Sequence, residues 1–214
     1  MPIEEYRERI TREKRAAALD AAINAFLEYG FDRTTLQQIA NAAGISSATV
    51  FKHFPTKADL FGAIMERLWE TGSQAHQMLP PLGNPRAGLL AIGNDYARLL
   101  RQPHIEPLFR VVIAEAPRFP ELGKALYERG KAPYLEWLHR YLAAEVAAKG
   151  LSIADVPLAA RQFLGMINDV IFWPRFLIQG LAIKNSEVER IVSEAVETML
   201  ARYGRVTAVT RSRK

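Results

Sequence analysis

The residues best suited to chemistry lie in one short segment, 34–57, where small, polar and basic side chains surround a glycine. A helix over 47–53 would turn Val50 and Phe54 inward and leave the remaining side chains outside. The outward residues are Ser47, Ala48, Thr49, Lys52 and His53. Small residues at the start of such a helix allow close approach to base edges, and polar groups can bind phosphates. The pattern predicts nucleic-acid contact, although a helical hairpin packed only for stability would share the spacing.

Residues that commonly carry catalysis or bind metals form no such pattern elsewhere in the chain. There is no cysteine, which excludes disulfides, thiolate nucleophiles and cysteine-ligated metal sites. The histidines do not form a zinc-type pair, and no nucleophile elbow, phosphate-binding loop or Gly-x-Gly-x-x-Gly run is present. These four histidines are His53, His76, His104 and His139. The sequence therefore predicts a protein that is not an enzyme and has neither a metal nor a cofactor.

The outward residues need two short helices to position them, expected over 35–43 and 47–53. Gly44 suits the turn between them because it adopts a left-handed backbone readily. Thr34 or Thr35 would cap the first helix, and Ser46 or Ser47 would cap the second. The two helices form a helix-turn-helix, whose second helix can enter a major groove.

Helical periodicity continues along almost the whole chain and predicts an all-α protein. The helix that precedes the motif is expected over about 7–29 and ends near Gly30; its buried stripe comprises Leu19, Ala22, Ile23 and Phe26. A further helix follows Thr56, and three prolines interrupt the pattern over 79–85. The later helices are expected over 86–101, 104–116, 121–149, 155–180 and 186–203, with bends at Pro133 and Pro174. The expected total is about nine helices.

The net charge of +5 comes from one end of the chain. Residues 1–60 hold equal numbers of acids and bases, whereas the residues after Glu197 include five bases and no acid. Four of these five bases lie in a basic tail over 205–214, which could bind phosphates or could be a solvated end. The first residues do not resemble a signal peptide, and no apolar run is long enough to span a membrane. We therefore expect a cytoplasmic protein.

The run over about 12–65 closely resembles the DNA-binding domain of the TetR family of bacterial transcriptional regulators. The resemblance includes the residues around the motif, from Phe26 to Thr35 and from His53 to Leu60. It implies a helix-turn-helix domain over 1–56, followed by a helical ligand-binding and dimerisation domain over 57–204.

The resemblance also implies which residues contact DNA. They are Thr35, Gln37, Ser47, Ala48, Thr49, Phe51, Lys52, His53 and Lys57. Lys57 would meet a phosphate at the start of its helix. Phe51 stands where the family usually has tyrosine, so a phosphate contact through a hydroxyl is lost. Phe51 could still pack against sugar or a thymine methyl, or belong to the core, and His53 could be only a local hydrogen-bond partner.

The segment 112–130 resembles the subgroup of this family with AefR-like C-terminal domains, whose members are commonly repressors. A ligand pocket is expected among the middle helices. The candidate ligand contacts are Trp69, Tyr96, His104, Phe109, Arg110, Trp137, Met166, Asn168 and Trp173. Each aromatic residue among them could equally be ordinary core. The polar residues Arg110, Glu115, Asn168 and Asp169 would be ligand handles if buried without partners and structural if paired.

The last two helices are rich in apolar residues and are expected to form a homodimer, as in the family's four-helix bundle. These residues are Phe163, Leu164, Ile167, Val170 and Ile171, and then Ile191, Val192, Ala195, Val196, Met199 and Leu200. The family resemblance implies a ligand-responsive repressor that binds a palindromic operator and is released by a small molecule. The alternative is a helical small-molecule-binding protein with weak or non-specific DNA binding.

Overall fold

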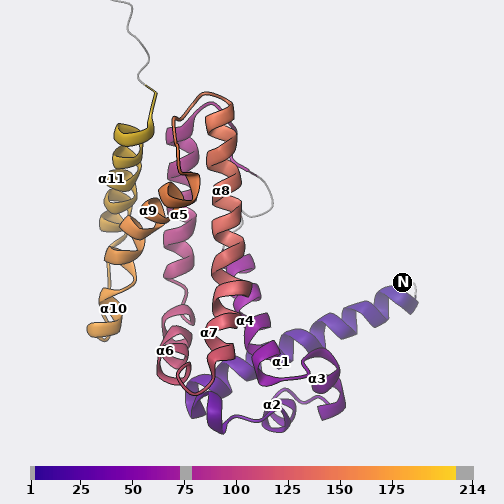
Figure 1. Ribbon diagram of the computed structural model, residues 1–214. Coiled ribbons are helices and arrows are strands. Elements are labelled where there is room, and N and C mark those ends of the chain that lie inside the picture. The colour runs from indigo at the N-terminus through magenta and orange to yellow at the C-terminus, as the bar shows by residue number, and fades with distance from the viewer. Residues whose placement is uncertain (1–2, 73–78, 206–214) are drawn as a thin grey trace, which may run out of the picture. The chain divides into compact units, whose positions relative to one another are not determined.

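The computed structural model describes residues 3–72 and 79–205, and every regular element in these ranges is helical (Figure 1). The helices are α1 (Ile3–Arg33), α2 (Leu36–Ala42), α3 (Ser47–His53), α4 (Lys57–Gly72), α5 (Pro85–Leu100), α6 (Ile105–Glu115), α7 (Pro120–Leu126), the π-helical turn η2 (Tyr127–Lys131), α8 (Ala132–Ala147), α9 (Val156–Ile171), α10 (Pro174–Leu177) and α11 (Asn185–Tyr203). The all-α prediction is confirmed. The helices number nine when α7, η2 and α8 count as one path and the short α10 is set aside. Residues 206–214 of the predicted basic tail lie outside the described residues.

The chain forms two compact units, and each draws on two stretches of sequence. The first comprises residues up to 71 together with 102–133, and the second comprises 72–101 and 134 onward. Helices α6 and α7 thus belong to the same unit as the helix-turn-helix. The boundary between functional domains after residue 56 stays a prediction.

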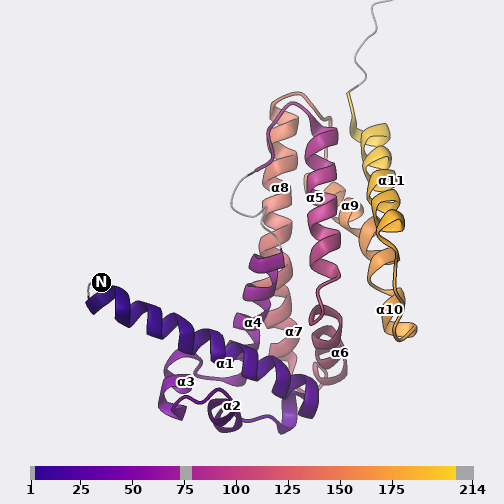
Figure 2. The ribbon, with the colours of Figure 1, turned by 180° about the vertical axis from the view of Figure 1, so that it is seen from behind.

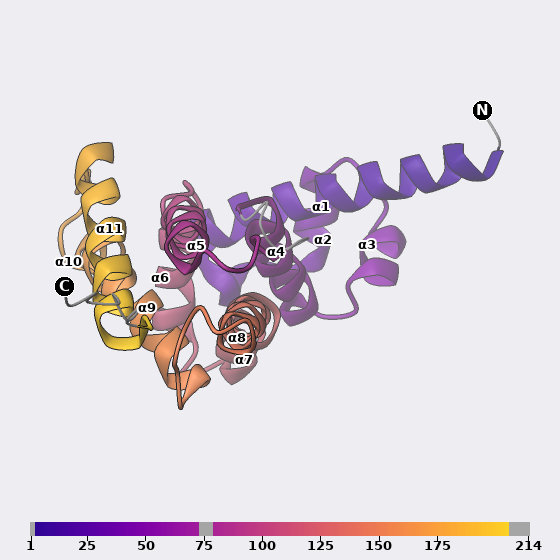
Figure 3. The same cartoon turned by 90° about the horizontal axis from the view of Figure 1, so that it is seen from above.

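The first unit is built on the apolar stripe of α1, whose four predicted residues are all buried. Phe26 packs against Phe31 and Phe61, with ring centroids 5.4 and 5.9 Å away, which joins α1 to α4. The helical backbone of α1 breaks at Gly30, where φ is 79°. Figure 3 shows the N-terminal half of α1 extending beyond α2 and α3. Burial of this stripe therefore places α2 and α3 on one side of α1.

The second unit packs α5 against α8, α9 and α11 (Figure 2). Gly93 of α5 allows a close approach, because a side chain there would meet Val192 at 2.6 Å and Phe163 at 3.3 Å. The Tyr134 hydroxyl of α8 donates to the Ile92 carbonyl of α5. Small and aromatic residues thus interlock to form this core.

The two prolines that were expected to bend helices act differently from one another. Pro133 lies just after the π-helical turn η2, in a helical path that runs from α7 into α8. Proline cannot donate a backbone hydrogen bond, and the wider π-helical turn accommodates that loss. Pro174 instead begins α10, since α9 has already ended at Ile171. Proline favours the first position of a helix because the lost N–H has no partner there. The predicted bend at Pro174 is therefore a break.

Helices long and apolar enough to cross a bilayer are absent from the described ranges. The same ranges contain no cluster of three or more histidine or acidic side chains able to hold a metal ion.

Candidate nucleic-acid interface

The first short helix, α2, is fixed by a capping box at its start. The Thr35 hydroxyl accepts from the Gln38 amide, and the Gln38 side chain accepts from the Thr35 amide at 2.8 Å. This arrangement satisfies two backbone donors that a helix end leaves free. Thr35, one of the two predicted caps, is thus the N-cap, while Thr34 is fully buried and donates to the carbonyls of Ala25 and Gly30.

The turn between α2 and α3 depends on Gly44 and Ser46. Gly44 adopts a φ of 65° with nothing within 4 Å of the position that a side chain would take. Ser46 then caps α3 by accepting from the Thr49 amide at 3.2 Å. The turn and the start of α3 are therefore specified by residues within this short segment.

The second short helix, α3, faces inward through Val50 and the following Phe54, which are 0% and 2% exposed. The remaining predicted contacts lie on the opposite side: Ala48, Phe51 and Lys52 are exposed, and Ser47, Thr49 and His53 are half-buried. Phe51 is 50% exposed, which excludes the alternative that it belongs to the core of this chain. The sequence between Thr35 and Thr56 contains no acid, so nothing on this face would repel phosphates.

Polar side chains of the two short helices bond to one another. The Ser47 hydroxyl donates to the Gln37 side chain at 2.5 Å, and that amide in turn donates to Asn41 at 3.0 Å. These bonds use the Ser47 hydroxyl hydrogen and one Gln37 amide hydrogen, which leaves the Ser47 oxygen as an acceptor and the second Gln37 hydrogen as a donor for base contacts. The pair also holds α3 in register with α2.

Lys57 opens α4, but its ammonium turns toward the end of α1. It donates to the carbonyls of Phe31 and Asp32, at 2.6 and 3.0 Å, and lies 4.6 Å from the centre of the Phe31 ring. Burial lowers the pKa of Lys57, and the nearby carboxylates of Asp32 and Glu115 oppose that shift. At most one ammonium hydrogen is left for the predicted phosphate contact. No pattern in the sequence indicates this long-range partnership.

The candidate ligand contacts divide between the two units, and only some of those in each unit lie together. In the first unit, Trp69 is buried and stacks on Phe109 with centroids 6.1 Å apart. His104 and Arg110 are exposed there, and Arg110 pairs with Glu106.

In the second unit, Tyr96 and Trp137 are buried and both contact Tyr134, with centroids 5.3 and 5.6 Å from that ring. Met166 and Asn168 are half-buried, and Trp173 is 46% exposed. Burial raises the pKa of Tyr96 above its ordinary value.

Two of the four polar residues singled out in the sequence have the paired, structural arrangement. Arg110 forms the ion pair above, and the Glu115 carboxylate accepts from two backbone amides. Asp169 is exposed.

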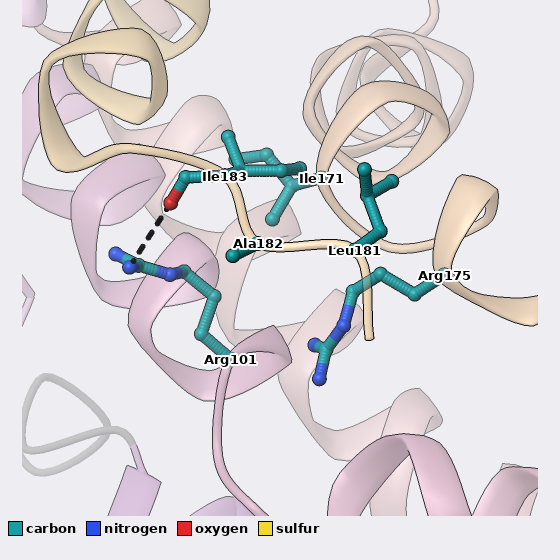
Figure 4. Close-up of a pocket in the computed structure, with 6 residues that line it drawn as sticks. All are labelled: Arg101, Ile171, Arg175, Leu181, Ala182 and Ile183. Carbon is teal, nitrogen blue, oxygen red and sulfur yellow. Dashed lines mark hydrogen bonds between the residues drawn. The ribbon is translucent and has the colours of Figure 1, made fainter. Parts of the chain in front are cut away.

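A cavity of about 160 Å³ lies in the second unit and includes none of the candidate ligand contacts (Figure 4). Its lining residues are Arg101, Ile171, Arg175, Leu181, Ala182 and Ile183. Both arginines bond to backbone carbonyls, Arg101 to Ile183 at 3.4 Å and Arg175 to Leu100 at 3.0 Å. Sequence reasoning missed this cavity, because the irregular segment after α10 has no periodic pattern to reveal it.

Comparison with known protein families gives two matches that together span most of the chain. Residues 18–64 match the model of the bacterial regulatory proteins of the tetR family. Residues 87–205 match the C-terminal domain of AefR-like transcriptional repressors. The helix-turn-helix lies entirely within the first match.

Individual relatives agree with these matches. The chain is 37% identical over 90 residues to the HTH-type transcriptional regulator TtgR of Pseudomonas putida, an overlap that covers 39% of this chain and 43% of TtgR. It thus matches less than half the length of that relative. A solved TetR family regulator of Pseudomonas syringae is 28% identical, with a TM-score of 0.71 over 91% of this chain and 98% of the other. The flavonoid-responsive regulator FrrA is 26% identical, with a TM-score of 0.71 over 89% and 97%.

Proposed function

Because this chain belongs to the TetR family of transcriptional regulators, we propose that it is a dimeric repressor that binds a palindromic operator and is released by a small molecule. The observation that carries the proposal is the outward face of α3, which presents small, hydroxyl-bearing and basic side chains without an acid. Such a helix suits the major groove. The family consists of regulators rather than enzymes, and a chromosomal operator would place the protein in the cytoplasm.

The proposed dimer uses α9, α10 and α11, but through fewer apolar residues than the sequence suggested. Most of the residues named there are buried inside the second unit, including Phe163, Ile167 and Val192. Val170 and Trp173 are 42% and 46% exposed, and Leu177 is 90% exposed. These side chains would lose contact with water in a dimer. A twofold dimer would present two α3 helices about 34–36 Å apart, or a multiple of that distance.

The proposed effector site lies around Tyr96 and Trp137. Their buried aromatic rings offer stacking surface, and the Tyr96 hydroxyl is a polar group beside them. FrrA is described as flavonoid-responsive, and this favours a flat aromatic effector for the present chain as well. An effector would release DNA only if it binds the conformation with low DNA affinity more tightly.

Selection of bound duplexes from sheared genomic DNA of the source organism, at two salt concentrations, tests the proposal. A palindrome that is still enriched at the higher concentration would support specific recognition by a dimer. Weak retention without a shared sequence, lost at higher salt, would contradict it and favour the alternative of a small-molecule-binding protein. Light scattering should give twice the 24.0 kDa mass of the chain, and a monomer would exclude the dimer.

Substitution of the outward face tests its role directly. Lys52→Ala and Thr49→Ala should each weaken binding to the selected palindrome about tenfold, since each removes one contact per subunit. Lys131→Ala, an exposed lysine in η2, is the matched control and should leave affinity unchanged. Equal affinity for all three variants, with unchanged thermal unfolding, would show that α3 is not the recognition helix.

A further inference from the structure

The junction between α1 and α2 is held by a side chain from far along the sequence. Glu115, the last residue of α6, accepts hydrogen bonds from the backbone amides of Phe31 and Asp32, at 2.8 and 3.2 Å. Each carboxylate oxygen takes one amide. The preceding residue, Gly30, has a φ of 79°, and a side chain there would lie 2.7 Å from the Glu115 carboxylate. Glycine at this position therefore makes room for the contact.

The same two residues are held from their other side by α4. Lys57 donates to both of their carbonyls, so the dipeptide Phe31-Asp32 is bonded through its amides to α6 and through its carbonyls to α4. Phe31 itself is 2% exposed. Arg118 adds an exposed ion pair with Asp32 at 3.1 Å. Three helices of the first unit thus meet at one backbone segment.

This segment leads directly into α2 and from there to α3, the proposed recognition helix. Thr34 anchors the chain to the Gly30 carbonyl, Thr35 caps α2, and Gln37 of α2 accepts from Ser47 of α3. A displacement at Phe31-Asp32 would be carried along α2 to α3, because each step is a hydrogen bond between packed, helical elements.

We infer that Glu115 is a positioning residue that sets the orientation of α2 and α3 relative to α6. A carboxylate is required because it offers two acceptors, whereas an amide offers one and would turn N–H groups toward a backbone N–H. Its charge also strengthens both bonds. Movement of α6 would therefore reorient α3. The consequence for DNA rests on the proposed function.

Amide hydrogen exchange tests the positioning role without DNA. Glu115→Ala and Glu115→Gln should speed exchange at Phe31 and Asp32 and across α2 by about tenfold or more, with exchange in α5 and α8 unchanged. Glu128→Gln, whose carboxylate pairs on the surface with Lys124, is the matched control. Unchanged exchange in α2 would overturn the inference. If Glu115→Ala does not fold, Glu115→Gln decides, because it keeps the side-chain volume and one acceptor.

Operator spacing gives the second readout. The wild type should bind the selected palindrome at least tenfold more tightly than a duplex with one base pair added at its centre, and Glu115→Gln should reduce that ratio about threefold. A merely structural role would instead weaken binding to both duplexes in equal proportion, which would overturn the inference. If the wild type binds no palindrome, the proposed function fails, while the exchange experiment still decides the role of Glu115.

Discussion

The helix-turn-helix and the α5–α8 pair differ in how far apart in the sequence their hydrogen-bonded residues lie. Side-chain hydrogen bonds within residues 34–56 join positions three to ten residues apart, such as Ser46 with Thr49 and Ser47 with Gln37. The bonds that join α8 to α5 and to the loop before it span 42 residues, from Tyr134 to Ile92, and 62 residues, from Glu145 to Gly83. The first region is therefore specified locally and the second by the tertiary fold.

This difference explains why one region could be assigned to a function and the other could not. Caps and a glycine turn have recognisable residue types, so α2 and α3 were predicted within about a residue. A binding cavity arises where distant helices fail to fill space, and its shape depends on contacts that no short pattern records. Substitutions should show that long-range contacts contribute more to stability than local ones.

Glu145→Ala should cause the largest effect, about 3 kcal/mol of lost stability. The carboxylate is fully buried and accepts from the Tyr141 hydroxyl at 3.1 Å and from the Gly83 amide at 3.2 Å, so its removal leaves a cavity and unpaired donors. Urea unfolding followed by tryptophan fluorescence measures the loss. Glu136→Ala, an exposed glutamate on the same helix, should cost little. If the free energy of unfolding falls by less than it does on loss of a helix cap, long-range contacts do not contribute more to stability than local ones.

Gly30→Ala should cost about 2 kcal/mol, because φ is positive and the new methyl group would press on the Glu115 carboxylate. Gly44→Ala is the local counterpart; it also has positive φ but meets no neighbour, so it should cost about 1 kcal/mol. The double variant Gly30→Ala with Glu115→Ala should recover part of the first loss. Equal costs for the two single variants would show that the contact with Glu115 contributes nothing.

Alkaline pH should destabilise the second unit through its buried tyrosines. Burial raises the pKa of Tyr96 and Tyr134 above the ordinary 10.0, so above pH 10 the folded state keeps protons that the unfolded state has released. Stability must then fall as pH rises, by about 1.4 kcal/mol per pH unit for each such group. Tyr96→Phe should remove about 1 kcal/mol from the loss between pH 10 and pH 11, because the unfolded tyrosine is only half ionised at pH 10. The exposed Tyr127 provides the control variant, and an unchanged slope in Tyr96→Phe would contradict the prediction.

Ser46→Ala should have a small effect, about 1 kcal/mol and similar to that of Gly44→Ala, because it removes one cap from a helix that also packs through Val50. Thermal unfolding by circular dichroism measures it, with Ser152→Ala, an exposed serine outside the helices, as control. A loss of stability as large as that of Glu145→Ala would mean that local contacts contribute as much to stability as long-range ones.

The sequence by itself determined the all-α class, the inward Val50 and Phe54, the outward face of α3 and the turn at Gly44. Each follows from periodicity, capping or backbone freedom, which act within a few residues. The outward placement of Phe51, left open by the sequence, was decided by how α3 packs.

Only the tertiary structure decided which distant groups meet. It turned Lys57 toward the carbonyls of Phe31 and Asp32, placed the Glu115 carboxylate on their amides, and buried most of the apolar residues of α9 and α11 inside the subunit. A short sequence pattern shows whether a side chain is charged or apolar, but it does not predict which distant residue that side chain contacts. The partner depends on which helices pack together, and that is settled by burial over the whole chain.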